Sequence, residues 1–145
     1  MVTKKDQEIA MGIRQLVSVL RKRLRKQISN PEDLSMAELN VLSMLMTRKE
    51  LLPSELGSQL KISSQFMSQV LKRLQELDYI SRKTAAEDKR KSLISITRTG
   101  QQMVEQTRKE RDEWLAKKIA TLYSAQEKET IKSALSLLTA LEDEQ

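Results

Sequence analysis

Two short helical segments, followed at once by two segments that alternate apolar and polar residues, leave few folds open to this chain of 145 residues. Pro53, a residue suited to the first turn of a helix, opens the first segment. After a short turn, either Ser63 or Ser64 can cap a second helix. Its apolar residues recur with the helical period at Met67, Val70, Leu71, Leu74 and Leu77. Two short helices joined by so few residues predict a helix-turn-helix.

The segment after this pair predicts the only β-hairpin of the chain. Residues 79–81 and 93–97 alternate apolar with polar side chains, which is typical of strands. Between them we expect a loop with five cations: Arg82, Lys83, Lys89, Arg90 and Lys91. Asp88 precedes Arg90 by two residues and can accept a charge-assisted hydrogen bond that directs the guanidinium. A lone basic loop predicts a solvated turn, but beside a helix-turn-helix it can reach a minor groove, where inserted Arg is favoured.

Long amphipathic helices flank this central region. Apolar residues at helical spacing predict a first helix from residue 6 to about residue 28, and Pro31 prevents its continuation. Ser35 and Glu38 then form a capping box, which predicts the start of a second, shorter helix. The first helix therefore stands before the helix-turn-helix as a separate element.

The C-terminal third predicts two further helices. Thr97 can cap a long helix that runs to about Tyr123, and a capping box at Ser124 and Glu127 predicts the last helix. The terminal helices carry apolar stripes that a chain of this length would struggle to cover alone, so we expect an intertwined dimer. We divide the chain into an N-terminal dimerisation helix (1–34), a winged helix-turn-helix DNA-binding domain (35–98) and C-terminal dimerisation helices (99–145).

Composition limits the fold and the function classes. Only three Gly and two Pro, with 39% hydrophobic and 32% charged residues, favour a mainly α fold. The chain has no Cys and no His, which excludes disulfides, thiolate or imidazole metal sites, and nucleophiles that depend on those side chains. Its carboxylates are scattered along helices and no Gly-rich phosphate loop occurs, so we expect no enzyme, no metal and no cofactor. Without a signal-peptide pattern or a run of about 20 apolar residues, we expect no membrane association and a cytoplasmic protein.

Charge and surface chemistry favour a polyanionic partner. The net charge is +6, and residues 47–98 carry the largest excess of cations. The second helix of the helix-turn-helix directs away from the core Ser64, Gln65, Phe66, Ser68, Gln69, Lys72 and Arg73. Gln and Ser can hydrogen-bond base edges, and Lys or Arg can neutralise phosphate. An ordinary solvated helix face explains the same pattern, and Phe66 can instead turn into the core.

Several of these segments resemble one known family. Asp88-x-Arg90, followed by Ile96, Thr97 and Gly100, is similar to the wing signature of the MarR (multiple antibiotic resistance regulator) family. Residues 52–82 resemble the two DNA-binding helices of that family, and the resemblance covers almost the whole chain. It implies a winged helix-turn-helix with long N- and C-terminal dimerisation helices. It also implies a homodimer that binds near-palindromic double-stranded DNA and is often released by a small anionic aromatic effector.

The resemblance assigns roles to single residues. Gln65, Phe66, Ser68 and Gln69 correspond to base-reading positions, Ser64 and Arg73 lie nearer the DNA backbone, and Ser54 corresponds to a phosphate contact. With the cap and the wing, the candidate DNA-binding residues are Ser54, Ser63, Ser64, Gln65, Phe66, Ser68, Gln69, Lys72, Arg73, Lys83, Asp88, Lys89, Arg90 and Lys91. Asp78 departs from the family, which usually has Gly there; Asp tolerates a left-handed helix end at modest cost.

Two hypotheses follow for the function. The first is a sequence-specific transcription regulator, a ligand-responsive repressor, with an effector pocket bordered by Arg14, Arg21, Met44 and Leu45. The second is an architectural or interaction protein that binds nucleic acid without sequence preference. The basic run from Arg21 to Lys26 suits nucleic acid or an anionic membrane surface, but it is more typical of a solvated helix face whose cations complement the helix C-terminus.

Overall fold

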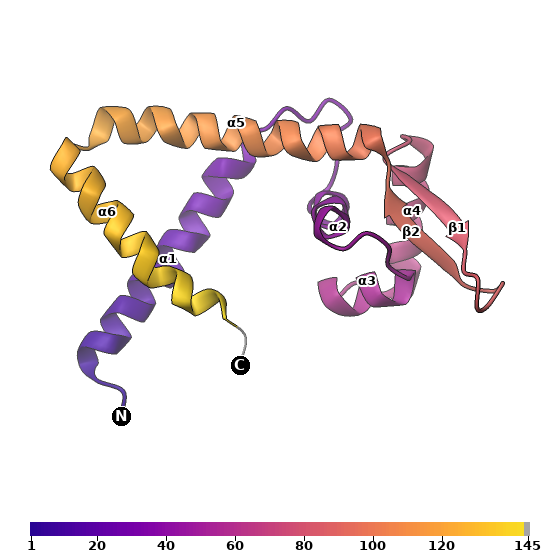
Figure 1. Cartoon of the computed structure of the whole chain (residues 1–145), viewed down its shortest axis with the longest axis horizontal. Helices are drawn as coiled ribbons and strands as arrows, with labels where there is room; N and C mark the ends of the chain where they lie inside the picture. Colours follow the sequence, from indigo (N-terminus) through magenta and orange to yellow (C-terminus); the bar gives the residue numbers. More distant parts are fainter. Residues whose placement is uncertain (144–145) are drawn as a thin grey trace. The chain divides into compact units, whose positions relative to one another are not determined.

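The computed structural model describes residues 1–143, so the last two residues of the predicted C-terminal segment 99–145 lie outside the described chain. The elements follow one another in the order shown in Figure 1. They are α1 (Lys4–Arg25), α2 (Met36–Thr47), α3 (Pro53–Leu60), α4 (Ser64–Glu76), β1 (Ile80–Thr84), β2 (Ser92–Ile96), α5 (Arg98–Leu122), α6 (Ala125–Leu138) and the short 3-10 helix η1 (Thr139–Glu142). The predicted fold class, mainly α with a winged helix-turn-helix, is confirmed.

The chain divides into two compact units. The central unit is Ile28–Lys109, and the terminal unit joins Met1–Gln27 to the chain from Glu110 onward. The predicted domains 1–34, 35–98 and 99–145 are assignments of role, and they stay predictions. Among the described helices, none combines the length and the apolar character that a membrane span requires.

One hydrophobic core holds the central unit together. It draws fully buried side chains from three helices and the hairpin: Val41, Leu42 and Leu45 of α2, Leu56 of α3, Met67, Leu71 and Leu74 of α4, and Ile80 and Ile94 of the hairpin. Leu51, between α2 and α3, exchanges two backbone hydrogen bonds with Ile94 of β2, at N–O distances of 3.0 and 2.8 Å. The helix-turn-helix and the hairpin are therefore parts of the same packed body.

The hairpin differs from its prediction in length. β1 and β2 are antiparallel, and their register pairs Ile80 with Ile96 and Arg82 with Ile94. Arg82 and Lys83, expected in the loop, lie within β1, which is exposed at every residue after Ile80. The alternation that predicted residues 79–81 stops there because the outer part of β1 buries no side chain, so the strand has no apolar signal.

The first helix also differs from its prediction. α1 begins earlier because Thr3 and Asp6 form a capping box, in which each side chain accepts a hydrogen bond from the other residue's backbone N–H. It ends at Arg25 rather than near residue 28, because the N–H groups of Lys26 and Gln27 bond three residues back, to the carbonyls of Arg23 and Leu24. The predicted capping boxes at Ser35–Glu38 and Ser124–Glu127 are both present.

The junction between β2 and α5 explains why Gly stands at residue 100. Thr97 caps α5: its hydroxyl accepts from Gly100 N at 3.0 Å and donates to the carbonyl of Asp78 at 2.6 Å. A Cβ atom at Gly100 would lie 2.3 Å from the carbonyl oxygen of Tyr79, a distance that no side chain tolerates. The Thr-x-x-Gly spacing thus lets α5 begin directly against the end of α4.

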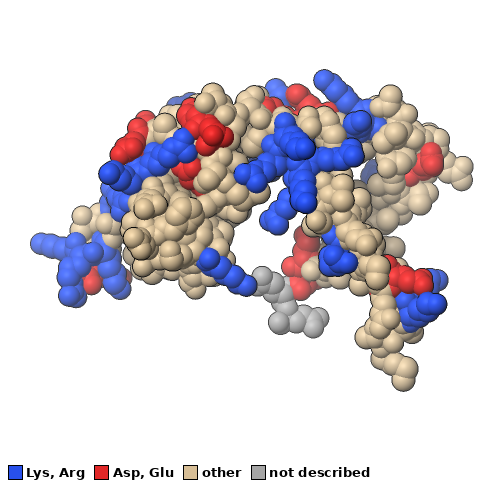
Figure 2. All heavy atoms as spheres, turned by 180° about the vertical axis from the view of Figure 1, so that it is seen from behind, with Lys and Arg blue, Asp and Glu red and all other residues tan. Residues whose placement is uncertain are grey.

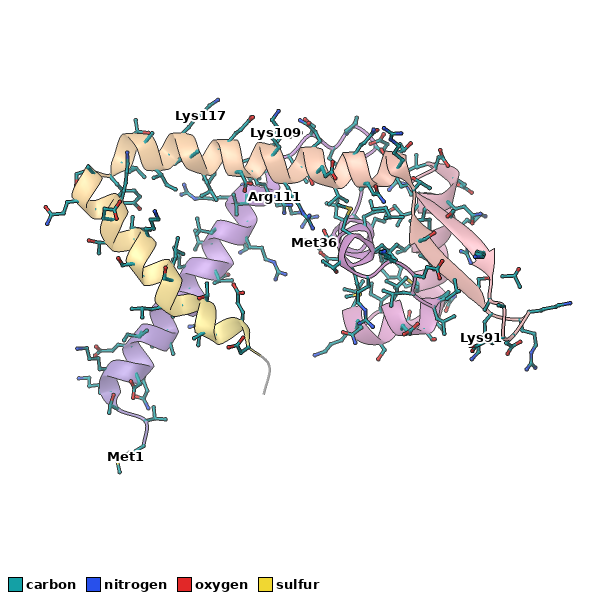
Figure 3. The ribbon with its side chains drawn as sticks, in the orientation of Figure 1. Met1, Met36, Lys91, Lys109, Arg111 and Lys117 are labelled. Atoms are coloured by element: carbon teal, nitrogen blue, oxygen red, sulfur yellow. The ribbon has the colours of Figure 1, made fainter. Side chains whose placement is uncertain are left out.

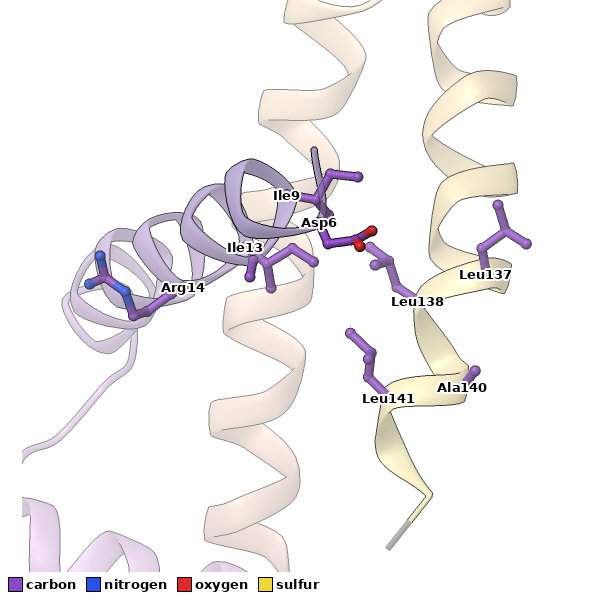
Figure 4. Close-up of a pocket in the computed structure, with 9 residues that line it drawn as sticks. Asp6, Ile9, Ile13, Arg14, Leu137, Leu138, Ala140 and Leu141 are labelled. Atoms are coloured by element: carbon purple, nitrogen blue, oxygen red, sulfur yellow. The ribbon is translucent and has the colours of Figure 1, made fainter. Parts of the chain in front are cut away.

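The terminal unit has a different character. Neither α1 nor α6 contains a buried residue. Within this unit, Ile9 and Ile13 of α1 face Leu138 and Leu141 across an open hollow of about 570 Å³ (Figure 4). Arg14 also lines the hollow, but its guanidinium points away from the leucines (Figure 4).

Candidate nucleic-acid interface

α4, the second helix of the helix-turn-helix, presents a polar face opposite its buried one. Ser63 is the N-cap, since its hydroxyl accepts from the N–H of Phe66 at 3.2 Å; this decides between Ser63 and Ser64. Met67, Val70, Leu71 and Leu74 are buried. Toward its N-terminal end and middle, α4 leaves six residues exposed at the surface: Ser64, Gln65, Phe66, Ser68, Gln69 and Lys72. The outward face therefore combines amide, hydroxyl and ammonium groups.

Phe66 is the one large apolar side chain on that face. It is 46% exposed, so the alternative that placed it in the core is wrong. The reason is its position in the helix: Met67 and Val70 already occupy the inward stripe, and Phe66 lies to one side of it. An exposed phenyl ring among amides and hydroxyls is suited to contact with a thymine methyl group.

Ser54 lies exposed in the first turn of α3. Pro53 occupies the position before it, and the Glu55 carboxylate accepts the N–H of Leu52 at 2.9 Å. Free N–H groups in the first turn of a helix favour an anion such as a phosphate. The position of Ser54 in the first turn of α3 therefore suits the predicted phosphate contact.

The hairpin loop is ordered around Asp88. The carboxylate accepts from both the backbone N–H of Arg90, at 3.0 Å, and its guanidinium Nε, at 3.3 Å. These two hydrogen bonds, backbone first, hold the pKa of Asp88 below its usual value, so the group stays ionised at neutral pH. The predicted Asp88–Arg90 pair is present, and the Arg90 side chain remains 91% exposed. Its remaining N–H donors are thus directed but unoccupied within the described chain.

The hairpin carries further cations besides Arg90. Lys83 of β1 and Lys89 and Lys91 of the loop are all exposed, and Lys91 lies at the loop end of the hairpin (Figure 3). Figure 2 shows Lys and Arg side chains spread over the face it draws, with fewer Asp and Glu among them. Arg82 of β1 is also exposed, but it differs from these lysines because its guanidinium has a partner in α4. Its Nε donates to Gln75 Oε1 at 2.9 Å, which joins β1 to the end of α4.

Arg73 lies in α4 but has partners inside the fold. Its guanidinium donates to Glu38 Oε1 at 2.8 Å, to the carbonyl of Asp33 at 3.4 Å and to the carbonyl of Glu32. Sequence reasoning missed these contacts: Glu38 was recognised only as the last residue of a capping box. No local pattern connects it to a residue in another helix. The predicted DNA contact of Arg73 stays a prediction.

Tyr79 also bonds to Glu32, and the sequence did not predict this contact either. Its hydroxyl donates to Glu32 Oε1 at 2.8 Å, and the ring is buried. Burial, and then the hydrogen bond to the Glu32 carboxylate, raises the pKa of Tyr79 to about 12. The position of Tyr79 at the start of a strand had indicated only an apolar residue.

Two of the four residues of the predicted effector pocket line separate hollows, one in each unit of the described chain. Arg14 lines the hollow of the terminal unit, whereas Leu45 lines another, of about 550 Å³, in the central unit. That second hollow also contains Lys49, Ser95 and Gln101. Arg21 and Met44 line neither, and the effector pocket stays a prediction. Within residues 1–143, no three carboxylates are grouped in a way that could hold a metal ion.

Comparison with known proteins identifies a set of transcriptional regulators. Residues 32–91 match the model of the MarR family. An HTH-type transcriptional regulator of Mycobacterium bovis is 29% identical over 140 residues, which covers 96% of each chain. The transcriptional regulator Tm0710 from Thermotoga maritima has a similar structure, with a TM-score of 0.74, 22% identity and coverage of 97% of this chain and 96% of its own. A mutant of MarR from E. coli, solved in complex with operator DNA, covers 94% of this chain and 99% of its own, with a TM-score of 0.59 and 22% identity.

Proposed function

We propose that the chain is a transcriptional regulator of the MarR family, whose model matches residues 32–91, and that it represses transcription by binding a specific operator. The observation that carries this proposal is the pairing of two surfaces within the central unit. One is the polar face of α4 with its exposed Phe66, and the other is the hairpin loop in which Asp88 directs Arg90. The first suits base edges in a major groove, and the second suits an adjacent minor groove.

We assign base reading to Gln65, Phe66, Ser68 and Gln69, and minor-groove insertion to Arg90. Lys72, Lys83, Lys89 and Lys91 then supply attraction to phosphate, with Ser54, Ser63 and Ser64 at the backbone beside them. This division follows the chemistry of each group: amides and hydroxyls can distinguish bases, whereas ammonium groups act as point charges. The complex of the E. coli relative with operator DNA supports a DNA partner.

The proposal includes a homodimer on a near-palindromic site. One helix and one hairpin contact a single half-site, and two copies double these contacts at a fixed spacing of about 34 Å. The exposed apolar surface of the terminal unit supports a dimer in which a second copy covers it. Its exposed apolar residues include Leu16 and Val17 of α1 and Leu135 and Leu141 of the C-terminal region. A small anionic aromatic effector that binds one arrangement of the dimer better would release the DNA.

Selection of bound sites from random duplexes tests the function. We expect one inverted-repeat sequence to emerge, and the full chain to bind it at least about 1,000-fold more tightly than a random duplex at the same salt concentration. Gln69→Ala should lower that ratio, whereas Lys72→Ala should weaken binding to both duplexes alike. Equal affinity of the unaltered protein for selected and random DNA would instead establish the architectural alternative.

Arg90→Ala tests the hairpin within the same experiment. We expect at least a tenfold loss of affinity with an unchanged thermal midpoint, because the side chain is exposed and, among residues 1–143, bonds only to Asp88. Lys89→Ala is the matched control, since it removes one neighbouring charge and should cost much less. If both substitutions have the same effect, Arg90 acts only as a point charge and the minor-groove assignment fails.

A further inference from the structure

We infer that Arg73 is a positioning residue, which fastens the recognition helix to residues 30–38, the stretch of chain that follows α1. The inference rests on the proposed function, because it concerns how α4 is held for DNA. It reassigns Arg73 from a phosphate contact to an internal attachment.

The three partners all come from one short segment. Arg73 Nη1 lies 2.8 Å from Glu38 Oε1 and 3.4 Å from the carbonyl oxygen of Asp33, and Nη2 donates to the carbonyl oxygen of Glu32. Two carbonyls and a carboxylate that converge on one guanidinium need its planar, forked set of N–H donors. These contacts use three of the five guanidinium N–H donors, so a phosphate would have at most two left.

The segment is itself ordered by local hydrogen bonds. The side-chain amide of Asn30 makes two hydrogen bonds to the backbone of Leu34: it accepts from Leu34 N at 2.8 Å and donates to Leu34 O at 3.0 Å. Asp33 has a positive φ of 52°, and Leu34 is buried in the core of the central unit. Residues 30–38 therefore have a defined backbone conformation, and the acceptors that this segment offers to Arg73 are held in fixed positions.

Glu38 has a second role in the same place. Its Oε1 atom accepts from Ser35 N at 2.8 Å in the capping box of α2 and also accepts from Arg73. The residue is only 4% exposed, and no other cation is paired with it within the described chain. A buried carboxylate requires a charged partner, so loss of Arg73 would leave Glu38 unpaired. The ion pair thus joins the first turn of α2 to the last turn of α4.

A second attachment lies beside the first. The hydroxyl of Tyr79, three residues after the end of α4, donates to Glu32 Oε1 at 2.8 Å. Arg73 and Tyr79 therefore contact Glu32 through its carbonyl and its carboxylate respectively. Two points of contact, one within α4 and one beyond it, fix the direction of the helix better than either does alone.

The position of Arg73 in α4 connects this attachment to DNA reading. Phe66, Gln69 and Arg73 follow one another at spacings of three and four residues, so they share one side of the helix. A contact that fixes Arg73 also fixes the rotation of α4 about its own axis. The base-reading side chains, Gln69 above all, then meet the groove at one angle. Loosening the attachment should therefore reduce sequence preference more than general DNA affinity.

Charge-preserving and charge-removing variants of the full chain distinguish attachment from phosphate contact. Arg73→Lys keeps the positive charge for a phosphate but loses the forked donors, and Glu38→Gln removes a negative charge, which by simple electrostatics should strengthen DNA binding. We expect each to weaken binding to the selected operator about tenfold and to leave binding to random DNA unchanged. The double variant should be no worse than either single variant, because both break one attachment.

Lys72→Gln is the matched control, one residue away on the same helix. It should weaken binding to both duplexes and reduce the slope of log affinity against log salt by about 0.9. If Arg73→Gln reduces that slope equally, and Glu38→Gln tightens binding, then Arg73 contacts phosphate and the inference is overturned.

Amide hydrogen exchange of the DNA-free protein separates this inference from the proposed function. In Arg73→Lys, the amides of Leu34 and Ser35 should exchange about tenfold faster, while that of Ile94, which bonds to Leu51, should not change. Unchanged exchange at Leu34 and Ser35 would refute the attachment. If the unaltered protein does not prefer any DNA sequence, the proposed function fails, and the exchange result still decides the role of Arg73.

Discussion

All buried side chains among residues 1–143 belong to the central unit, whereas α1 and α6 of the terminal unit bury none. The central unit closes its own core from α2, α3, α4, the hairpin and the start of α5. The terminal unit leaves apolar residues such as Leu16 and Leu135 more than half exposed. Exposed apolar surface on this scale indicates a binding partner. One part of the chain therefore closes its core as a single copy, and we propose that a second copy covers the other part.

Leu74→Ala should have the largest effect, because Leu74 is fully buried among the core side chains of the central unit. We expect the free energy of unfolding to fall by about 3 kcal/mol through lost burial and a residual cavity. Urea unfolding followed by circular dichroism measures it. The loss should be the same at every protein concentration; a loss that depends on concentration would mean that this core is completed by a second copy.

Leu135→Glu tests the other side of the comparison. Leu135 is 58% exposed in the single chain, and a carboxylate there would lose its hydration on burial between two copies. We expect the dissociation constant of the dimer to rise at least tenfold, about 1.4 kcal/mol, in sedimentation equilibrium. The matched control is Lys132→Glu on the same helix. An unchanged dissociation constant for Leu135→Glu would exclude this face from the dimer interface.

Tyr79→Phe tests whether the central unit depends on its buried polar cluster as well as on its core. The pKa of Tyr79 is raised to about 12 from the ordinary 10.0, by burial first and then by the hydrogen bond to Glu32. A raised pKa favours the neutral phenol, so its contribution is complete below pH 10 and is lost as the pH rises through 12. At pH 8, the substitution should cost about 1 kcal/mol, because Glu32 Oε1 loses its donor.

Urea unfolding of both proteins from pH 8 to pH 11.5 measures this dependence. The difference in stability between the unaltered protein and Tyr79→Phe should shrink toward the upper end of that range. Tyr123→Phe is the control, because Tyr123 lies in the terminal unit and should leave the pH dependence of the central unit as it is. A constant difference at all pH values would show that the Tyr79 hydroxyl does not titrate as described.

Asp78→Gly should have the smallest effect, and it should be stabilising. Asp78 has a positive φ of 62° at the end of α4, a conformation that costs Gly less than Asp. The carbonyl that accepts from Thr97 belongs to the backbone and is retained. We expect a gain of about 0.5 kcal/mol in the free energy of unfolding, measured by urea denaturation. Lys61→Gly, at a φ of 56°, is the matched case, and a loss of stability in both would contradict the argument.

Local signals in the sequence were sufficient for the elements and for part of the site. The capping boxes at Ser35 and Ser124, the left-handed Asp78 and the Asp88–Arg90 pair were all predicted and are all present. Each involves residues no more than three positions apart, or a single backbone conformation. Such features depend on short-range geometry that any chain with these residues adopts, and so one sequence is enough to find them.

Packing between segments that are distant in sequence determined the features that local signals did not predict. Phe66 was left open between core and surface because its neighbours in sequence do not say which stripe of α4 turns inward. The outer half of β1 was missed because its stability comes from pairing with β2 rather than from an apolar pattern. Arg73 was predicted to lie at DNA, yet it bonds to Glu38 and to two carbonyls, partners 35 or more residues away. No periodicity records a contact at that separation, because only the folded core brings α4 against the start of α2.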